Sequence, residues 1–364
     1  MNCGEMTERI LITGGAGFVG SNLALSFKRD RPSATVIAFD NLRRRGSELA
    51  LSRLRTGGVE FLHGDIRSMD DLVNVGPANI LIEASAEPSV FAGYDGDPNY
   101  LVHTNLFGAA NCLEYARRHG SDFVFLSTSR VYPIDALRAL PLDSNDSRFF
   151  LRSGVQQLGV SAKGISESFP LRGHRSLYGT TKLAAELLVE EYRTMYGLRT
   201  VINRCGVISG PWQMGKVDQG FVVLWLSHHL FGSPLSYLGF GGHGLQVRDV
   251  LHIDDLCDLI VRELDGLDEY SGSLFNVGGG MASSVSLREL TAISEKMSGR
   301  KLELGRVSET RDADIPFYVS DYQAVTRTTG WTPNRSLDQL LEDVWSWLVD
   351  ERAQLEPILS EWTT

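Results

Sequence analysis

A glycine-rich turn near the N-terminus places the tightest constraint on the fold of this chain. The stretch TGGAGFVGSNL follows the apolar run RILI and leads into a helix-like stretch, so the turn would join a strand to a helix. Its glycines Gly14, Gly17 and Gly20 allow a tight turn, a close approach of backbone N–H groups to a pyrophosphate, and close packing of the helix on the strand. The turn therefore predicts the first unit of a dinucleotide-binding domain.

Short strand-like runs alternate with helix-length stretches through the first part of the chain. These runs are apolar without polar alternation, which is typical of strands buried on both faces of a sheet. The alternation predicts an α/β fold with a Rossmann-type doubly wound parallel sheet. The expected strands are 9–15, 34–41, 59–66, 79–86, 122–129 and 199–205, and the expected helices are 18–29, 47–55, 68–75, 99–118 and 178–196.

The pattern changes after residue 206, where the chain is rich in Gly, Trp, His and Gln. Periodic stretches return later, so we expect a second, smaller α/β lobe that binds the substrate. The stretch 134–176 is long and weakly patterned, and a loop of that length is usually functional or disordered. The expected division is a nucleotide-binding domain of residues 1–205, to which 250–278 return, and a substrate-binding lobe of 206–249 and 279–364.

The identity of the cofactor depends on the end of the second expected strand. Asp40 stands where a carboxylate accepts hydrogen bonds from an adenosine ribose. That carboxylate would repel a 2′-phosphate and so favours NAD, although Arg43–Arg45 could bind such a phosphate or form a solvated loop. We expect NAD. The residues expected to bind this end of the cofactor are Gly14, Gly17, Phe18, Val19, Gly20, Asp40, Asn41 and Arg44.

Further candidate residues stand where later strands end, which is where open α/β sheets bind ligands. Asp65 and Ile66 end the third strand, and the carboxylate could meet the adenine amino group. Ala84, Ser85 and Ala86 end the fourth strand and are small enough to lie against the cofactor. Ser127 and Thr128 end the fifth, where a hydroxyl could meet a substrate oxygen.

A tyrosine and a lysine in SLYGTTK carry the strongest chemical signal. Tyr178 and Lys182 are four residues apart at the start of an expected helix, so they share one face. An ammonium beside a phenol lowers the pKa of the tyrosine and makes it a usable proton acceptor. An isolated pair at this spacing is more often an ordinary surface pair, so the interpretation depends on the rest of the chain.

Charge and composition exclude several other classes of function. A net charge of −10 over 364 residues argues against nucleic-acid and anionic membrane surfaces. We expect no signal peptide and no transmembrane helix, since no apolar run reaches the roughly 18 residues that a span needs. The four cysteines and eight histidines have no metal-ligand spacing, and adjacent His228 and His229 are interpreted as structural. A cytoplasmic protein without a metal site is expected.

Together these motifs resemble the extended short-chain dehydrogenase/reductase family, which includes the nucleotide-sugar epimerases and dehydratases. The resemblance covers nearly the whole chain, including NLFGAANCLEYA from Asn105, GLQVRDVLHIDDL, FNVGGG, RDADIPFYVSD and GWTP. It implies that Tyr178 is the acid/base, that Lys182 holds the nicotinamide ribose and lowers the pKa of the tyrosine, and that Thr128 bonds the reacting sugar oxygen. Asn105 joins the expected cofactor-binding residues.

The residues after the fifth strand bear on the reaction. Dehydratases of this family carry Thr-Asp-Glu there and decarboxylases Thr-Ser-Glu, whereas this chain has Thr128-Ser129-Arg130. Without those carboxylates, epimerisation is favoured. GISESFPLRGHRSLYGTTK and WQMGKVDQGFVVLWL, with Asp218 in the second, resemble the epimerases that invert carbon 2 of CDP-linked sugars. A UDP-hexose 4-epimerase, a keto-sugar reductase and a non-catalytic NAD-binding protein are the alternatives.

The substrate would be a nucleotide sugar with a CDP or UDP carrier. Arg248 and Arg311 are candidates for its diphosphate, because guanidinium groups suit phosphate oxygens, although salt bridging would explain them too. Gln213 and Gln219 could contact the base or ribose, and Glu87 the sugar. The resemblance implies a homodimer or homotetramer built on the helices at 99–118 and 178–196, which could equally be buried within one subunit.

Overall fold

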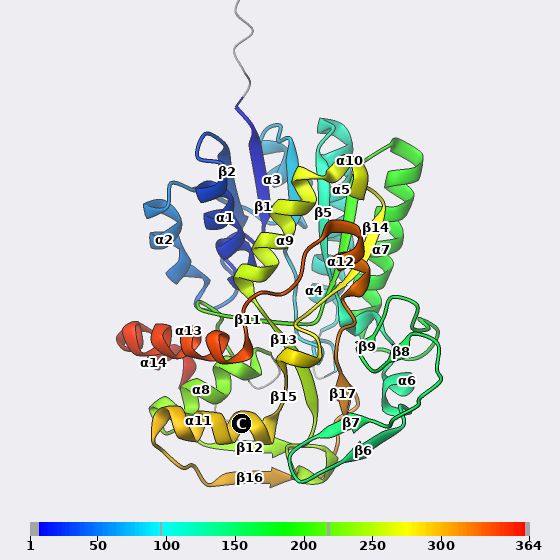
Figure 1. Cartoon of the computed structure of the whole chain (residues 1–364). Coiled ribbons are helices and arrows are strands. Elements are labelled where there is room, and N and C mark those ends of the chain that lie inside the picture. The colour runs from blue at the N-terminus through cyan, green and yellow to red at the C-terminus, as the bar shows by residue number, and fades with distance from the viewer. Residues whose placement is uncertain (1–6, 95–96, 217–218, 361–364) are drawn as a thin grey trace, which may run out of the picture.

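The computed structural model describes residues 7–94, 97–216 and 219–360 and consists of two stacked lobes (Figure 1). The upper lobe contains a seven-stranded sheet in the order β14-β10-β5-β4-β1-β2-β3, with every neighbouring pair parallel. The Rossmann-type doubly wound sheet predicted from the sequence is confirmed. Its strands are β1 Arg9–Thr13, β2 Thr35–Asp40, β3 Glu60–His63, β4 Ile80–Glu83, β5 Asp122–Thr128, β10 Thr200–Cys205 and β14 Ser273–Val277.

Helices cover both faces of this sheet and bury its apolar side chains. On one face α1 (Phe18–Asp30) packs beside α9 (Ile253–Asp265), and Phe27 and Leu256 belong to the same core. On the other face lie α3 (Met69–Asn74), α5 (Ala109–His119) and α7 (Leu177–Tyr196). The apolar strands and amphipathic helices that alternate in the sequence thus form three layers, with the sheet between two layers of helices. The remaining upper-lobe helices are α2 Ala50–Thr56, α4 Asn99–Val102, α10 Leu267–Tyr270 and α12 Gln323–Thr329.

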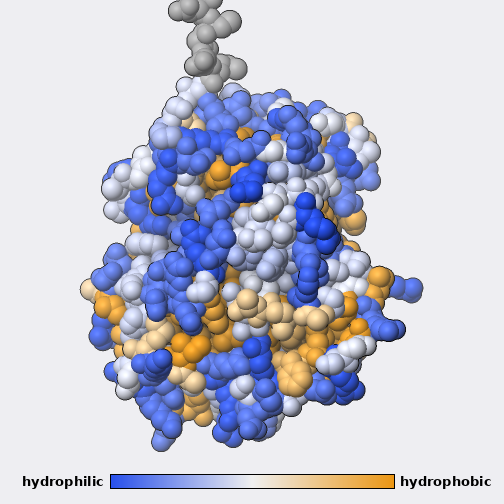
Figure 2. All heavy atoms as spheres, viewed as in Figure 1, coloured by the Kyte–Doolittle hydropathy of each residue, from blue (hydrophilic) through white to orange (hydrophobic). Residues whose placement is uncertain are grey.

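The lower lobe is a smaller α/β unit around a second core. Its main sheet joins β11 (Val207–Ser209), β13 (Val247–His252), β15 (Ser284–Ser286) and β17 (Phe317–Tyr318). The helix α8 (Phe221–Phe231) is apolar nearly all round because other elements surround it. Figure 2 shows apolar side chains in a band across this lobe, beneath a mostly polar upper lobe. The other elements are β12 Leu235–Leu238, β16 Leu304–Val307, α11 Leu287–Ser298, α13 Leu337–Asp350 and α14 Arg352–Leu359.

The chain crosses between the lobes more often than the sequence indicates. Strand β14 lies at one edge of the upper sheet, within the segment 250–278 that we expected to return there. Helix α12 packs on β14, and Trp331 belongs to the upper core, although we expected 279–364 to lie in the substrate-binding lobe. The amphipathic pattern predicts a helix at such a place but not the core that it joins. We therefore propose that the nucleotide-binding domain also includes α12 and Trp331.

The long stretch 134–176 is ordered and contacts both lobes. It forms α6 (Ile134–Arg138) and the hairpins β6–β7 (Leu142–Ser144 with Phe149–Leu151) and β8–β9 (Val160–Ser161 with Gly164–Ile165). The Phe149 N–H donates to the Leu245 carbonyl over 2.9 Å in the lower lobe. The Asn276 N–H of β14 donates to the Glu167 carboxylate over 2.7 Å. The segment therefore ties the upper sheet to the lower lobe.

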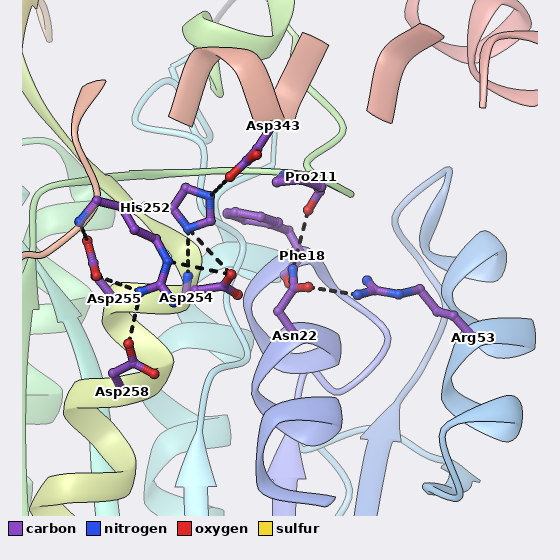
Figure 3. Close-up of polar contacts among 10 residues, drawn as sticks. Phe18, Asn22, Arg53, Pro211, His252, Asp254, Asp255, Asp258 and Asp343 are labelled. Carbon is purple, nitrogen blue, oxygen red and sulfur yellow. Dashed lines mark hydrogen bonds and ion pairs between the residues drawn. The ribbon is translucent and has the colours of Figure 1, made fainter. Parts of the chain in front are cut away.

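Polar side chains join the lobes at the first turn of α1 (Figure 3). Asn22 donates to the Pro211 carbonyl over 3.4 Å and accepts a hydrogen bond from Arg53 over 2.8 Å. His252 caps α9 by accepting the Asp254 N–H over 3.0 Å, and its Nε2 lies 3.3 Å from the Asp343 carboxylate on α13.

None of the helices in the described ranges combines the length and apolar character that a membrane span requires.

A buried carboxylic acid in α9 makes the stability of the fold depend on pH. Glu263 is fully buried and accepts a hydrogen bond from the Asn203 amide over 2.8 Å. Burial raises the pKa of Glu263 to about 8 from its usual 4.5. The folded chain therefore binds this proton more tightly than the unfolded chain does. The resulting stabilisation is present below the unfolded pKa and is lost as the pH rises towards about 8.

We predict that Glu263→Gln raises the melting temperature above that of the wild type at about pH 9 and changes it little at about pH 5, because the amide needs no proton to stay neutral. Thermal unfolding across this range measures the difference. Glu60→Gln, at an exposed position, is the control and should leave the pH profile unchanged. A wild-type melting temperature that rises with pH over the same range would contradict the assignment.

Candidate active site

Two cavities meet at the carboxyl edge of the upper sheet. A cleft of about 400 Å³ follows the glycine-rich turn and the ends of β2 and β3. An inner cavity of about 380 Å³ lies between the lobes and contains Tyr178 and Thr128. Ala84, Ser85 and Ala86 line both cavities, together with Phe18 and Val19. A molecule in the cleft can therefore reach the inner cavity past the small residues at the end of β4.

The glycine-rich turn has the geometry of a phosphate cradle. The Gly17 N–H donates to the Gly14 carbonyl over 2.9 Å, with Gly14 at a φ of +63°. A Cβ on Gly20 would overlap the Gly14 carbonyl, so the helix could not lie so close to the turn. Gly17 is the N-cap of α1 and has no side chain to cap the first N–H groups. These groups are available to a phosphate at the helix N-terminus.

Asp40 lies where a ribose-binding carboxylate is expected. Its two oxygens accept the Leu42 N–H over 2.7 Å and the Ala16 N–H over 3.1 Å. Burial raises the pKa of Asp40, and these backbone N–H groups oppose the shift. Asp65 accepts a hydrogen bond from Asn41 over 2.9 Å. Although burial opposes it, hydrogen bonding to Arg67 and Asn41 lowers the pKa of Asp65 to about 2, so this carboxylate is ionised at neutral pH.

Arg44 crosses the cleft to the segment that precedes α8. Its guanidinium donates to the Met214 carbonyl over 3.0 Å and to the side-chain oxygen of Gln219. Arg43 lies over the ring of Tyr100, 3.8 Å from the ring centroid. Arg44 and Gln219, which the sequence assigned to cofactor and substrate, are thus joined to each other in the wall of the cleft. Asp218, which precedes Gln219 in the motif WQMGKVDQGFVVLWL, lies outside the described residues.

The three expected catalytic side chains line one cavity. Thr128 is the last residue of β5, Tyr178 lies in the first turn of α7, and Lys182 follows one turn later. The hydroxyl of Ser176 caps α7 by accepting the Gly179 N–H over 3.3 Å, which fixes where the helix begins. The side chain of Tyr178 is therefore held at the wall of the inner cavity, next to Thr128.

The role that we expected of Lys182, lowering the pKa of Tyr178, stays a prediction, and burial works against it. Burial raises the pKa of Tyr178 to about 12, although its hydrogen bond with Thr128 opposes this. The Lys182 ammonium lies 3.5 Å from the Glu83 carboxylate and 4.0 Å from the centroid of the Phe125 ring. Helical spacing places the two residues on one face, but the buried carboxylate on β4 decides where the ammonium lies.

Two expected cofactor-binding residues have other partners. Ser127 donates to the Glu186 carboxylate on α7, which also pairs with Arg204 on β10 over 2.7 Å. The amide of Asn105 accepts the Glu87 N–H over 2.8 Å and donates to the Glu87 carbonyl over 3.0 Å. Asn105 lies in a π-helical stretch, His103–Gly108, between α4 and α5. It holds the loop after β4 and lines neither cavity.

Arginines form the cationic part of the inner cavity. Arg248 donates to the Ile315 carbonyl over 2.7 Å, and burial, together with the nearby charge of Arg130, lowers its pKa to about 9. Arg311 pairs with Asp314 over 3.0 Å and lies 3.9 Å from the centroid of the Phe91 ring. The sequence did not identify Arg130 as a site residue, yet it lines this cavity and donates to the Ala313 carbonyl over 3.1 Å. Its position directly after Thr128-Ser129 is the signal that could have identified it.

The other predicted residues divide between the two cavities, and Glu87, which we expected at the sugar, lines the cleft and not the inner cavity. Gln213 lines both cavities, but its amide already bonds Ser209 over 2.8 Å and the Ile208 carbonyl over 2.9 Å. In the described part of the chain, no three His, Cys, Asp or Glu side chains gather as a metal site would need. The cleft itself is lined by Gly14, Gly17, Phe18, Val19, Gly20, Asp40, Asn41, Arg44, Asp65, Ile66, Ala84, Ser85, Ala86 and Glu87.

Comparison with known families identifies the class of this site. The profile of the NAD dependent epimerase/dehydratase family matches residues 10–278, and the chain belongs to this family. NAD is accordingly its cofactor, and the glycine cradle and Asp40 fit that group. Asp40, the bare N-terminus of α1 and Tyr178 would hold its ribose, its pyrophosphate and its reactive end.

Individual relatives narrow the class to enzymes of nucleotide sugars. The chain is 30% identical to the CDP-paratose 2-epimerase of Salmonella typhi over 93% of this chain and 98% of that protein. It is 32% identical to a dTDP-glucose 4,6-dehydratase of Mycobacterium tuberculosis over 71% of this chain and 69% of that protein. The structure of the dehydratase DesIV of Streptomyces venezuelae with NAD and TYD is similar at a TM-score of 0.76 and 27% identity, covering 96% of this chain and 99% of that one.

We predict that two glycine substitutions in the cradle have separate effects. In Gly17→Ala the new Cβ meets only the Gly14 carbonyl, at 3.1 Å, so the fold should persist while the methyl group weakens NAD binding tenfold or more, on the order of 1.4 kcal/mol. In Gly20→Ala the overlap with the turn should lower the stability by about 1–3 kcal/mol even without NAD. Calorimetric NAD titration and thermal unfolding measure the two effects. Equal loss of stability in both variants would contradict this division of roles.

Proposed function

We propose that this protein epimerises a nucleotide-diphosphate sugar at the inner cavity, with NAD held in the adjoining cleft. The observation that carries the proposal is the position of Tyr178 and Thr128, which lie where the cleft opens into a cavity lined by Arg248 and Arg311. The guanidinium groups suit a diphosphate, and the hydroxyl pair suits one sugar oxygen. The absence of carboxylates from Ser129 and Arg130 favours epimerisation over elimination of water.

When bound, NAD would supply a hydride acceptor and donor for a sugar carbon. In its phenolate form Tyr178 takes the proton of the hydroxyl on that carbon, and Thr128 holds the oxygen through its own hydroxyl. The resulting keto-sugar turns its other face within the inner cavity. Tyr178 then gives the proton back to the oxygen, which leaves the opposite configuration and no net oxidation.

The substrate that we favour is a CDP-linked 3,6-dideoxyhexose, inverted at carbon 2 as in CDP-tyvelose and CDP-paratose. Support comes from the relative named CDP-paratose 2-epimerase, which matches this chain over almost its full length. A UDP-hexose 4-epimerase is the alternative. Arg130 favours a further variant, a sugar that carries a carboxylate, because its guanidinium lies beside Tyr178 and has no carboxylate within ion-pair distance among the described residues.

Proton NMR of the purified protein with three sugars and no added cofactor tests the proposal. Inversion at carbon 2 of a CDP-linked 3,6-dideoxyhexose would support the favoured substrate and a retained NAD. Inversion at carbon 4 of UDP-glucose or UDP-glucuronate would support the epimerase mechanism and contradict the favoured CDP-sugar substrate. Loss of water from dTDP-glucose, run as a fourth sample, would contradict epimerisation.

We predict that Tyr178→Phe lowers turnover by at least about 10²–10⁴-fold, because the proton then has no acceptor at the reacting oxygen. NAD content should stay at the wild-type level, since the cleft and Lys182 are unchanged. Turnover and the absorbance of bound nicotinamide are measured on the same sample. Tyr115→Phe, a change of another buried tyrosine on α5 that lines neither cavity, is the matched control for packing. Activity in Tyr178→Phe equal to that of the wild type would overturn the proposed role.

We also propose that the protein is a homodimer through α7 and the neighbouring π-helical stretch. Leu187, Met195 and Phe107 are 57%, 66% and 53% exposed on these helices. Leu187 and Met195 are eight residues apart and so share a face, and apolar side chains gathered on one helix face mark an interaction surface.

We predict that Leu187→Asp halves the mass measured by light scattering, because it places a charge in that interface. Leu158→Asp is the control, since Leu158 is 67% exposed in the stretch 134–176 on a different part of the molecule. An unchanged mass for Leu187→Asp, or a monomeric wild type, would contradict a dimer through this face.

A further inference from the structure

A fully buried ion pair lies directly beneath the proposed proton-transfer residues. Glu83 is the last residue of β4, between β1 and β5 in the middle of the sheet, and Lys182 lies on α7 above it. The two side chains are 1% and 2% exposed, and their charged atoms are 3.5 Å apart. The glycine-rich turn, the strand ends and the YxxxK pair were all read from the sequence, but nothing there singled out Glu83.

The surroundings give the Lys182 ammonium few other partners. Taking an ammonium out of water costs several kcal/mol unless an opposite charge lies near it. Among the described residues, Glu83 is the one carboxylate within ion-pair distance of Lys182. The Phe125 ring supplies a weaker attraction on another side. The other titratable groups that face this pair from the packed elements are Tyr178 on the same helix, Cys112 on α5 and Cys205 on β10.

We propose that Glu83 is a positioning residue, whose carboxylate holds the Lys182 ammonium in place and supplies the negative charge that offsets it beside Tyr178. This inference rests on the proposed function, in which Tyr178 transfers the proton. The role of Glu83 can be tested separately from the identity of the sugar, because it concerns the electrostatic effect of Glu83 on Tyr178.

The proposal predicts the direction in which the dyad of Tyr178 and Lys182 titrates. The negative charge of Glu83 opposes formation of the Tyr178 phenolate. When that charge is removed, the dyad must lose its first proton at a lower pH, whichever of the two groups keeps the remaining proton. A single charge at this range in a protein interior shifts such a titration by on the order of one pH unit.

The first test is a direct titration that needs no substrate. We compare the tyrosinate absorbance of the wild type and of Glu83→Gln, each after subtraction of its Tyr178→Phe counterpart and at matched NAD content. We expect the Tyr178 signal of Glu83→Gln to appear about one pH unit lower. Glu83→Asp keeps the charge and should titrate near the wild type. Asp255→Asn removes a buried carboxylate that pairs with the partly exposed Arg335 elsewhere in the chain, and it should cause no shift.

A charge-free variant covers the case in which Glu83→Gln fails to fold because its ammonium lacks a partner. The double variant Glu83→Gln/Lys182→Met buries neither charge, and its titration is compared with that of Lys182→Met alone. The proposal requires the double variant to titrate at the lower pH of the two. An equal or higher value in either comparison would overturn it, since Glu83 would then be neutral or purely structural.

The pH dependence of turnover is the second readout. The acid limb of kcat should move to lower pH in Glu83→Gln, by about the same amount as the direct titration, while activity at higher pH is retained. A loss of activity that is equal at every pH would indicate a structural role and contradict the proposal. If the titration shifts as expected and no sugar is epimerised, the proposed substrate fails and the role of Glu83 stands.

Discussion

The ion pair between Glu186 and Arg204 is the interaction on which the geometry of the site depends. It joins α7 to β10 in the interior, where the two side chains are 2% and 4% exposed. The same carboxylate accepts the Ser127 hydroxyl at the end of β5, and Arg204 donates to the Tyr132 hydroxyl over 3.3 Å. Breaking such a pair on one side leaves an uncompensated buried charge. The first turn of α7, and with it Tyr178, is therefore held at one distance from the strand ends.

Much of the fold could be predicted because its signals are local. The glycine spacing, the apolar strands and the helix periods each depend on neighbouring residues, and they agree with one another. The cradle followed as well, since Gly20 and Asp40 act through the backbone turn and the strand end at which they stand. The strand-end rule accounts for Thr128 alone. Its pairing with Tyr178, which lies on the helix α7, came from the resemblance to the family.

The directions of long side chains could not be predicted in this way. Lys182, Arg44 and Gln213 have several rotatable bonds, so their partners are decided by what packs nearby. Glu83 and Gln219 supply those partners for the first two, from segments about a hundred residues or more away in the chain. Arg130 was read only as a missing carboxylate, because the sequence does not show into which cavity it points. These are contacts of tertiary structure, and no local pattern encodes them.

The contact of Arg44 with Gln219 and Met214 bears on whether the bound cofactor would exchange with free cofactor in the cell. A dinucleotide bound in a cleft that is bridged from one lobe to the other would be held from both sides, so its release would require that the bridge open. A cofactor retained in this way is a fixed component and not a second substrate. The direction and extent of the proposed epimerisation would then follow from the two sugars alone, without influence from the balance of oxidised and reduced nucleotide in the cell.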